Sequence, residues 1–165
     1  MSSSILYLNR IAPWRVPTCK SDHYNLLTYN LFFMRTIKKI IIHSTATPAG
    51  RAVSVGEIDA WHRARGYEGI GYHFVVGLDG EVSAGRAVEK AGAHCLGQNA
   101  DSVGVVYVGG TAVDGKIPVD TRTEAQRVAL RAVAATLKGC FPGAKVYGHR
   151  DFRPTACPSF PIEEL

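Results

Sequence analysis

Near the C-terminal end of the 165-residue chain, a histidine and a cysteine stand eight positions apart, at His149 and Cys157. An imidazole nitrogen and a thiolate sulfur are both good ligands for zinc. Two ligands do not make a metal site, so at least one further donor must come from elsewhere in the chain. A third candidate is His43, which follows directly after residues 40–42, a run of three isoleucines that predicts a buried strand.

Three protein ligands are typical of a catalytic zinc site, because such a site keeps a fourth position open, whereas a structural site is closed by four ligands. Zinc held in this way is a Lewis acid and activates water near neutral pH, and both effects serve amide hydrolysis. Asp151 stands just after His149 and is a candidate to orient an imidazole. Taken singly, a histidine is more often structural and a lone cysteine is usually a small buried apolar residue. The joint placement at predicted strand ends favours the metal site.

The patterns around these residues predict alternating strands and helices. Ser54 and Glu57 have the spacing of a capping box, and Thr121 or Thr123 is the predicted cap of a second helix. Asp79-Gly80 is a turn signal that joins two strands into a hairpin. The predicted strands are 40–42, 71–78, 81–85, 103–108 and 144–147, and the predicted amphipathic helices are 55–65 and 122–138. This order predicts an α/β domain with a single mixed central sheet covered by helices.

Two further histidines are left out of the predicted site. Alternation along the predicted strand 71–78 places Tyr72 and Phe74 on one face of the sheet and His73 on the other. His62 lies in the first predicted helix, where the amphipathic pattern explains it adequately.

Composition limits the class of protein. With 46% hydrophobic residues, the chain is long enough to bury the core of one domain. Its net charge of +5 suits an anionic polymer such as bacterial cell wall, and it equally suits an ordinary solvated surface. No run of Lys and Arg and no interleaved aromatic stripe favours nucleic acid. Four widely spaced cysteines without a CxxC pair favour a reduced compartment and one functional thiol over a disulfide framework.

Residues 1–34 show neither helical nor alternating periodicity, and we interpret them as an irregular extension of a domain at 35–165. Two interpretations stay open: Met34 is the true start of the protein, or the extension packs on the domain through its aromatic residues. The extension is a poor signal peptide, and no apolar run approaches the roughly 18 residues of a membrane helix. We therefore expect no membrane insertion, and a protein that stays in the cytoplasm until a holin-type release or a non-classical export.

Five stretches of the chain form a specific combination of motifs. They are Ile40-Ile41-Ile42-His43-Ser44-Thr45-Ala46-Thr47, Gly71-Tyr72-His73-Phe74-Val75-Val76, Gly92-Ala93-His94, Asn99-Ala100-Asp101-Ser102-Val103-Gly104-Val105, and Gly148-His149-Arg150-Asp151 with Ala156-Cys157-Pro158-Ser159-Phe160. In this combination the sequence resembles the zinc-dependent N-acetylmuramoyl-L-alanine amidases of type 2, a family that includes small phage lysozyme-amidases and the peptidoglycan-recognition proteins. The resemblance covers nearly all of the chain beyond residues 1–34 and implies the α/β fold of that family.

The resemblance implies hydrolysis of the amide bond between N-acetylmuramic acid and the L-alanine of the peptidoglycan stem peptide, as in a bacteriolytic endolysin or a wall-remodelling enzyme. By position, it implies that His43, His149 and Cys157 are the Zn²⁺ ligands. It further implies that the Tyr72 phenol hydrogen-bonds the zinc water or the oxyanion, and that His94 contacts the substrate or the oxyanion. We expect peptidoglycan as the partner, no nucleic acid, and a monomer.

Thr155 departs from the pattern of many phage members of that family, which carry a lysine two positions before the cysteine ligand. Threonine cannot supply the positive charge that would stabilise an oxyanion, although its hydroxyl can still donate a hydrogen bond. Catalytically active peptidoglycan-recognition proteins resemble this chain in having threonine there. Because no acidic general base matches, Tyr72 and Thr155 are the predicted catalytic residues.

The alternative function is a recognition module that binds peptidoglycan without cutting it. Within the family that the sequence resembles, loss of the cysteine ligand is the usual mark of such a module. Cys157 is present in this chain, which favours the enzyme. A third hypothesis, in which zinc is only structural, is weaker because three ligands leave a position open.

Overall fold

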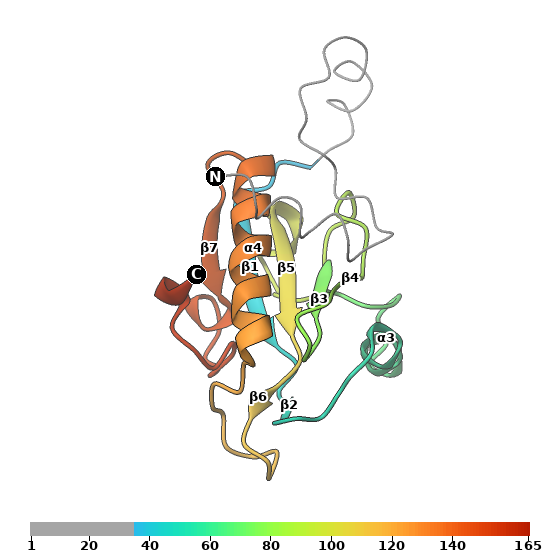
Figure 1. Ribbon diagram of the computed structural model, residues 1–165. Coiled ribbons are helices and arrows are strands. Elements are labelled where there is room, and N and C mark those ends of the chain that lie inside the picture. Colours follow the sequence, from blue (N-terminus) through green and yellow to red (C-terminus); the bar gives the residue numbers. More distant parts are fainter. Residues whose placement is uncertain (1–34) are drawn as a thin grey trace.

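The computed structural model describes residues 35–165, and the extension predicted at 1–34 lies outside the described residues. A five-stranded sheet with the order β4-β3-β5-β1-β7 forms the centre of this part (Figure 1). Neighbouring strands are parallel except at the β3–β4 hairpin on one edge, so the sheet is mixed, as predicted. The strands are β1 (Lys39–Ser44), β3 (Phe74–Val76), β4 (Val82–Ala84), β5 (Ser102–Tyr107) and β7 (Lys145–Gly148).

Two helices supply apolar side chains to opposite faces of this sheet. From α4 (Glu124–Cys140), residues such as Leu130 pack against Ile40 and Ile42 of β1 on one face. From α3 (Val55–Ala64), Ile58 belongs to a separate cluster with valines of β3 and β5. Figure 1 shows α4 lying along the strands and α3 standing apart from it, beyond β4. Because side chains alternate along β1, His43 is turned to the face away from α4.

Both helices begin at caps that the sequence indicates. The Ser54 hydroxyl accepts a hydrogen bond from the Glu57 amide at the start of α3. At the start of α4, Thr123 and Gln126 form a reciprocal capping box. Thr121, the other candidate cap, instead accepts a hydrogen bond from the amide of Gly110, outside the helix. Each cap stabilises its helix by about 1 kcal/mol, which helps to fix where the helix starts.

Short elements complete the described part of the chain. β2 (Thr47–Pro48) and β6 (Gly110–Thr111) form a small parallel sheet of their own. Three 3-10 turns are η1 (Asn99–Asp101), η2 (His149–Asp151) and η3 (Ile162–Glu164). Among the described helices, none combines the length and the apolar character that crossing a bilayer requires.

The strand predicted at 71–78 is shorter in the structure, where β3 covers only Phe74–Val76. The carbonyl groups of Tyr72 and His73 both bond to amides of the same neighbouring segment, at Arg86 and Gly85 respectively. In a regular strand, successive carbonyl groups point to opposite sides. The alternation of side chains therefore breaks immediately before β3, and this break decides where Tyr72 lies.

Candidate metal centre and active site

Three side chains that the sequence singles out as metal ligands come together at one edge of the sheet. His43 lies near the C-terminal end of β1, and His149 begins η2 directly after β7. Since β1 and β7 are parallel neighbours, the ends of both strands meet, and the loop after η2 brings Cys157 to the same place. The ligand atoms of the three residues lie within 4.8 Å of one another. Within residues 35–165, this is the only group of three or more His, Cys, Asp or Glu close enough to hold a metal ion.

The separation between His43 and Cys157 suits zinc. The Nδ1 atom of His43 lies 3.9 Å from the Cys157 Sγ atom. A tetrahedral zinc ion with ordinary bond lengths to nitrogen and sulfur would hold these atoms about 3.6 Å apart. The other ring nitrogen of His43, Nε2, is already paired with Nδ1 of His94 at 3.0 Å. Nδ1 is therefore the nitrogen of His43 that can face a metal, and the donor set fits Zn²⁺.

Burial sets the charge of these ligands. Burial lowers the pKa of His43 well below its ordinary value, and the neighbouring His94 and His149 act in the same direction. Burial lowers the pKa of His149 as well. Both imidazoles are therefore neutral near pH 7, which is the form that binds a metal ion. Burial raises the pKa of the Cys157 thiol, and a hydrogen bond of 3.2 Å from the Ser44 amide to Sγ acts against that rise.

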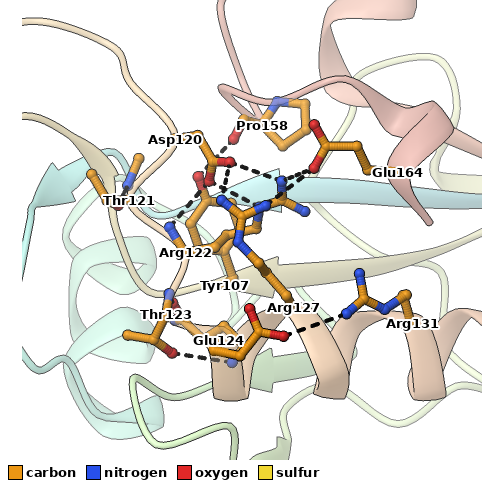
Figure 2. A network of polar contacts seen from close by, with 12 residues as sticks. Tyr107, Asp120, Thr121, Arg122, Thr123, Glu124, Arg127, Arg131, Pro158 and Glu164 are labelled. Carbon is orange, nitrogen blue, oxygen red and sulfur yellow. Dashed lines mark hydrogen bonds and ion pairs between the residues drawn. The ribbon is translucent and has the colours of Figure 1, made fainter.

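Buried polar contacts with the ends of β5 and β6 hold the loop that carries Cys157. The hydroxyl of Tyr107, at the end of β5, donates a hydrogen bond of 2.7 Å to the Pro158 carbonyl (Figure 2). The Ser159 hydroxyl donates to the Gly110 carbonyl at 3.0 Å. Phe160 is buried in the main core, against Tyr107. Three consecutive residues after Cys157 are thus each held by the domain.

A charged network reinforces this loop from the side of α4. The Arg122 side chain is fully buried and pairs with Asp120 at 2.8 Å and with Glu164 of η3 (Figure 2). The guanidinium carbon lies 3.3 Å above the ring of Phe160, so the cation also stacks on the end of the Cys157 loop. Arg127 of α4 pairs with the same two carboxylates. The network therefore connects α4, the Cys157 loop and η3.

Tyr107→Phe tests whether the buried contact below the Cys157 loop contributes to stability. The change is expected to lower the free energy of unfolding by about 1–3 kcal/mol, because it leaves the Pro158 carbonyl buried without its donor. Chemical denaturation measures the loss. Tyr147→Phe is the matched control, since Tyr147 is half-buried against Phe152 and should change stability by less than about 0.5 kcal/mol. Equal losses in both variants would contradict the role of the buried hydrogen bond.

Tyr72 lies beside the candidate metal ligands, with its ring centroid 5.1 Å from that of His43. It packs against the apolar cluster on the α3 face, whereas Phe74 packs against the α4 face. The predicted alternation was therefore wrong for Tyr72, because the regular strand begins only after it. Burial raises the pKa of the Tyr72 phenol, and the negative charge of a Cys157 thiolate adds to the effect. The Tyr72 hydroxyl consequently stays protonated at neutral pH and can donate a hydrogen bond.

His62, which the sequence analysis left out, supports Tyr72 from α3. Its Nδ1 atom accepts a hydrogen bond of 2.8 Å from the Gly71 amide, immediately before Tyr72. The His62 and Tyr72 rings pack together at 5.3 Å between centroids. In the sequence, the only sign of this role was a polar residue, His62, within the apolar stripe of the predicted helix. That pattern does not indicate which residue His62 would contact.

His94 lies directly behind His43, in the loop between β4 and β5, and is only 9% exposed. Its ring nitrogens are near partners inside the protein, His43 at 3.0 Å and Ser102 at 3.4 Å. The predicted contact of His94 with substrate stays a prediction, and these contacts give it no support. His73, the other histidine left out, is also buried, and its ring centroid is 5.7 Å from that of His94. Burial lowers the pKa of His94 to about 3 and that of His73 to about 4, so both are neutral near pH 7.

Thr155 and Asp151 hold the backbone around the ligands. The Thr155 hydroxyl accepts a hydrogen bond of 3.3 Å from the Cys157 amide, which leaves its own proton free to be donated. Thr155 is exposed. Asp151 accepts a hydrogen bond from the Gly148 amide at 2.9 Å and so stabilises the turn that presents His149. From the sequence, Asp151 was expected to orient an imidazole, but its carboxylate bonds to this backbone amide instead.

Fold and site together define an α/β domain with a cluster of three candidate metal ligands at the C-terminal end of its parallel strands. Residues 33–160 match the model of the family described as N-acetylmuramoyl-L-alanine amidase, and the chain belongs to this family. The resemblance inferred from the sequence is thereby confirmed, as is the fold class. The endolysin of Klebsiella phage KP32 is 42% identical over 125 residues, which cover 76% of this chain and 82% of that one.

Solved structures agree with this assignment. The N-acetylmuramoyl-L-alanine amidase LysC from Clostridium intestinale is 30% identical and superposes with a TM-score of 0.66, over 79% of this chain and 83% of that one. The wild-type PGRP-LB of Drosophila is 29% identical, with a TM-score of 0.60 over 77% of each chain. The fold is therefore shared by a bacterial amidase and an insect protein of the PGRP type.

Proposed function

We propose that the chain is a zinc-dependent hydrolase of peptidoglycan that cleaves the amide bond between N-acetylmuramic acid and the L-alanine of the stem peptide. The observation that carries the proposal is the convergence of His43, His149 and Cys157 within 4.8 Å. Membership of the amidase family and the likeness to phage endolysins support it. The monomeric state and the cytoplasmic location before release stay predictions.

The chemistry needs a polarised carbonyl, a water and a donor for the developing negative charge. Bound to His43, His149 and Cys157, Zn²⁺ would supply a Lewis acid and a water activated near neutral pH. Tyr72 holds a protonated hydroxyl beside these ligands and is the candidate donor to the carbonyl oxygen as it gains charge. Addition of water and cleavage of the C–N bond yield a carboxylate on the lactyl group and a free amino group on alanine.

The direct test incubates the zinc-loaded protein with purified sacculi and identifies the soluble products by mass spectrometry. Free stem peptides with an N-terminal alanine are the expected products. Intact muropeptides, with binding to sacculi retained, would instead favour the recognition module. A product cut at a glycosidic bond or within the stem peptide would contradict the proposed bond.

Thr155→Val tests the predicted role of the Thr155 hydroxyl. The change is expected to lower kcat by about 10-fold, which is less than for a donor in a water-excluded site because Thr155 is exposed. Thr155→Ser is the matched control and should keep most of the activity, since it keeps the hydroxyl. Kinetics on a soluble muropeptide, together with the zinc content of each variant, give the measurement. Zinc loss in the valine variant would indicate that Thr155 acts only by holding the Cys157 amide.

A further inference from the structure

His94 is a buried histidine that has no role in the proposed reaction, and its ring contacts the candidate ligand His43 on the side away from Cys157. The rings of His43 and His94 meet edge to face, with centroids 5.0 Å apart. His43 Nε2 lies 3.0 Å from His94 Nδ1, and His94 Nε2 lies 3.4 Å from the Ser102 hydroxyl. His43 and Ser102 are almost completely buried, at 1% and 0% exposed. The contact therefore joins groups that are almost entirely shielded from bulk water.

The direction of these hydrogen bonds follows from the ligand role of His43. A ring nitrogen that binds a metal must present its lone pair, so His43 has its proton on Nε2 when Nδ1 faces the metal. That Nε2–H donates to Nδ1 of His94, which must then carry no proton. The proton of His94 consequently sits on Nε2 and points to the Ser102 hydroxyl. In the row formed by His43, His94 and Ser102, each N–H thus has an acceptor, and both hydrogen bonds run from His43 toward Ser102.

The surroundings of His94 form a slot fitted to its ring. A Cβ atom placed on Gly104 of β5 would lie 2.5 Å from the His94 ring, and one on Gly92 would lie 2.4 Å from it. Both distances are closer than real Cβ contacts allow, so any larger residue at these positions would displace the ring. The Asn99 side chain accepts hydrogen bonds from the amides of His94 and Cys95, at 3.0 and 2.9 Å. The ring and the backbone of His94 are therefore both held in place.

We propose that His94 is a positioning residue for His43: by accepting the proton of Nε2, it keeps Nδ1 unprotonated and turned toward the metal. This inference rests on the proposed zinc centre. Histidine ligands of metals ordinarily donate their second nitrogen to a carboxylate, a carbonyl group or water, and loss of that partner weakens metal binding. Here a neutral imidazole takes this place. His94 then acts through His43 and does not need to touch the substrate.

The test compares His94→Leu with His94→Asn. The two side chains branch at the same atom and are similar in size, but the asparagine oxygen stands where Nδ1 of His94 stood and can still accept the proton of His43. The zinc dissociation constant is measured by competition with a chromophoric chelator. His94→Leu is expected to weaken zinc binding by about 10- to 100-fold, and His94→Asn should recover most of that loss.

Comparing His94→Leu with His94→Asn distinguishes a role in positioning His43 from a role in packing alone. Both variants replace the five-membered ring by a branched side chain of four heavy atoms, so a purely structural role would weaken zinc binding to a similar extent in both. Equal loss, or wild-type affinity in His94→Leu, would overturn the inference while leaving the zinc centre intact. Failure of the wild-type protein to bind zinc at all would overturn the zinc centre and this inference together.

A measurement on the unaltered protein keeps the inference testable even where a variant fails to fold. Nitrogen-15 NMR of the zinc-loaded protein reports which ring nitrogen of each histidine carries the proton. The expected result is a protonated Nε2 and a metal-bound Nδ1 in His43, with an unprotonated Nδ1 in His94. A proton on Nδ1 of His94, or zinc bound at Nε2 of His43, would overturn the proposed direction of the row.

Discussion

Cys157→Ala is expected to abolish the release of stem peptides from sacculi and to weaken zinc binding by more than about 100-fold. The estimate is a lower bound, because loss of a mere hydrogen-bond partner of a ligand already costs about 10- to 100-fold. Cys157 supplies the sulfur that lies 3.9 Å from His43 Nδ1, and its removal leaves two ligands. Two imidazoles alone make neither a structural nor a catalytic zinc site of the known kinds.

Zinc content after dialysis and product release from sacculi measure this effect. Cys140→Ala is the matched control, since Cys140 is the last residue of α4 and lies outside the ligand cluster. It should keep both zinc and activity. Cleavage at the wild-type rate in Cys157→Ala would mean that the metal assignment is wrong. Loss of cleavage with retention of binding to sacculi would show that the fold persists as a recognition module.

The three candidate ligands could be named from local sequence, because each stands at the end of a predicted strand or in the loop that follows one. Three consecutive isoleucines indicate a strand buried on both faces, and a polar residue directly after such a strand tends to face a ligand. His43 fits this pattern. His149 follows a second short strand, and the structure makes β1 and β7 parallel neighbours. Residue type and strand ends therefore singled out the two histidines, whereas the pairing of β1 with β7, which brings them to one edge, came from the structure.

The surroundings of the ligands could not be predicted in the same way. Tyr72 departs from simple alternation because two successive carbonyl groups turn to one neighbour, and no residue type signals such an irregularity. His94 meets His43 across 51 positions of the sequence, and this contact depends on how a loop packs. The stacking of Arg122 on Phe160 likewise joins segments that come together only in the folded chain. Periodicity describes faces of single elements, whereas these contacts arise between elements.

The arrangement separates two tasks within a small volume. On the buried face behind His43 lie the neutral imidazoles of His94 and His73, whose pKa values burial lowers far enough below 7 that they stay uncharged there. Of the two, His94 contacts His43. Arg122 and its carboxylate partners hold the Cys157 loop from the α4 side. Tyr72 and the exposed Thr155 contribute to neither of these supports, and we propose that they are the groups that meet a substrate.

Tyr72→Phe is the second change with a large expected effect. It removes one hydroxyl and keeps the ring that packs between His43 and His62. We expect kcat to fall by about 10²- to 10³-fold, which is the effect of removing one oxyanion donor from an enclosed site. Zinc affinity should stay unchanged, because the phenol is not one of the three ligands.

The division between kcat and KM tells what the Tyr72 hydroxyl does. A donor that acts only as charge develops lowers kcat and kcat/KM equally when it is removed, whereas a group that binds the substrate uniformly raises KM alone. Kinetics on a soluble muropeptide with the zinc-loaded variant give both constants, and Tyr147→Phe serves as the matched control. Loss of zinc in Tyr72→Phe would assign the hydroxyl to the support of the metal site. Unchanged kcat with full zinc would remove Tyr72 from the catalytic residues and leave Thr155 as the remaining candidate donor.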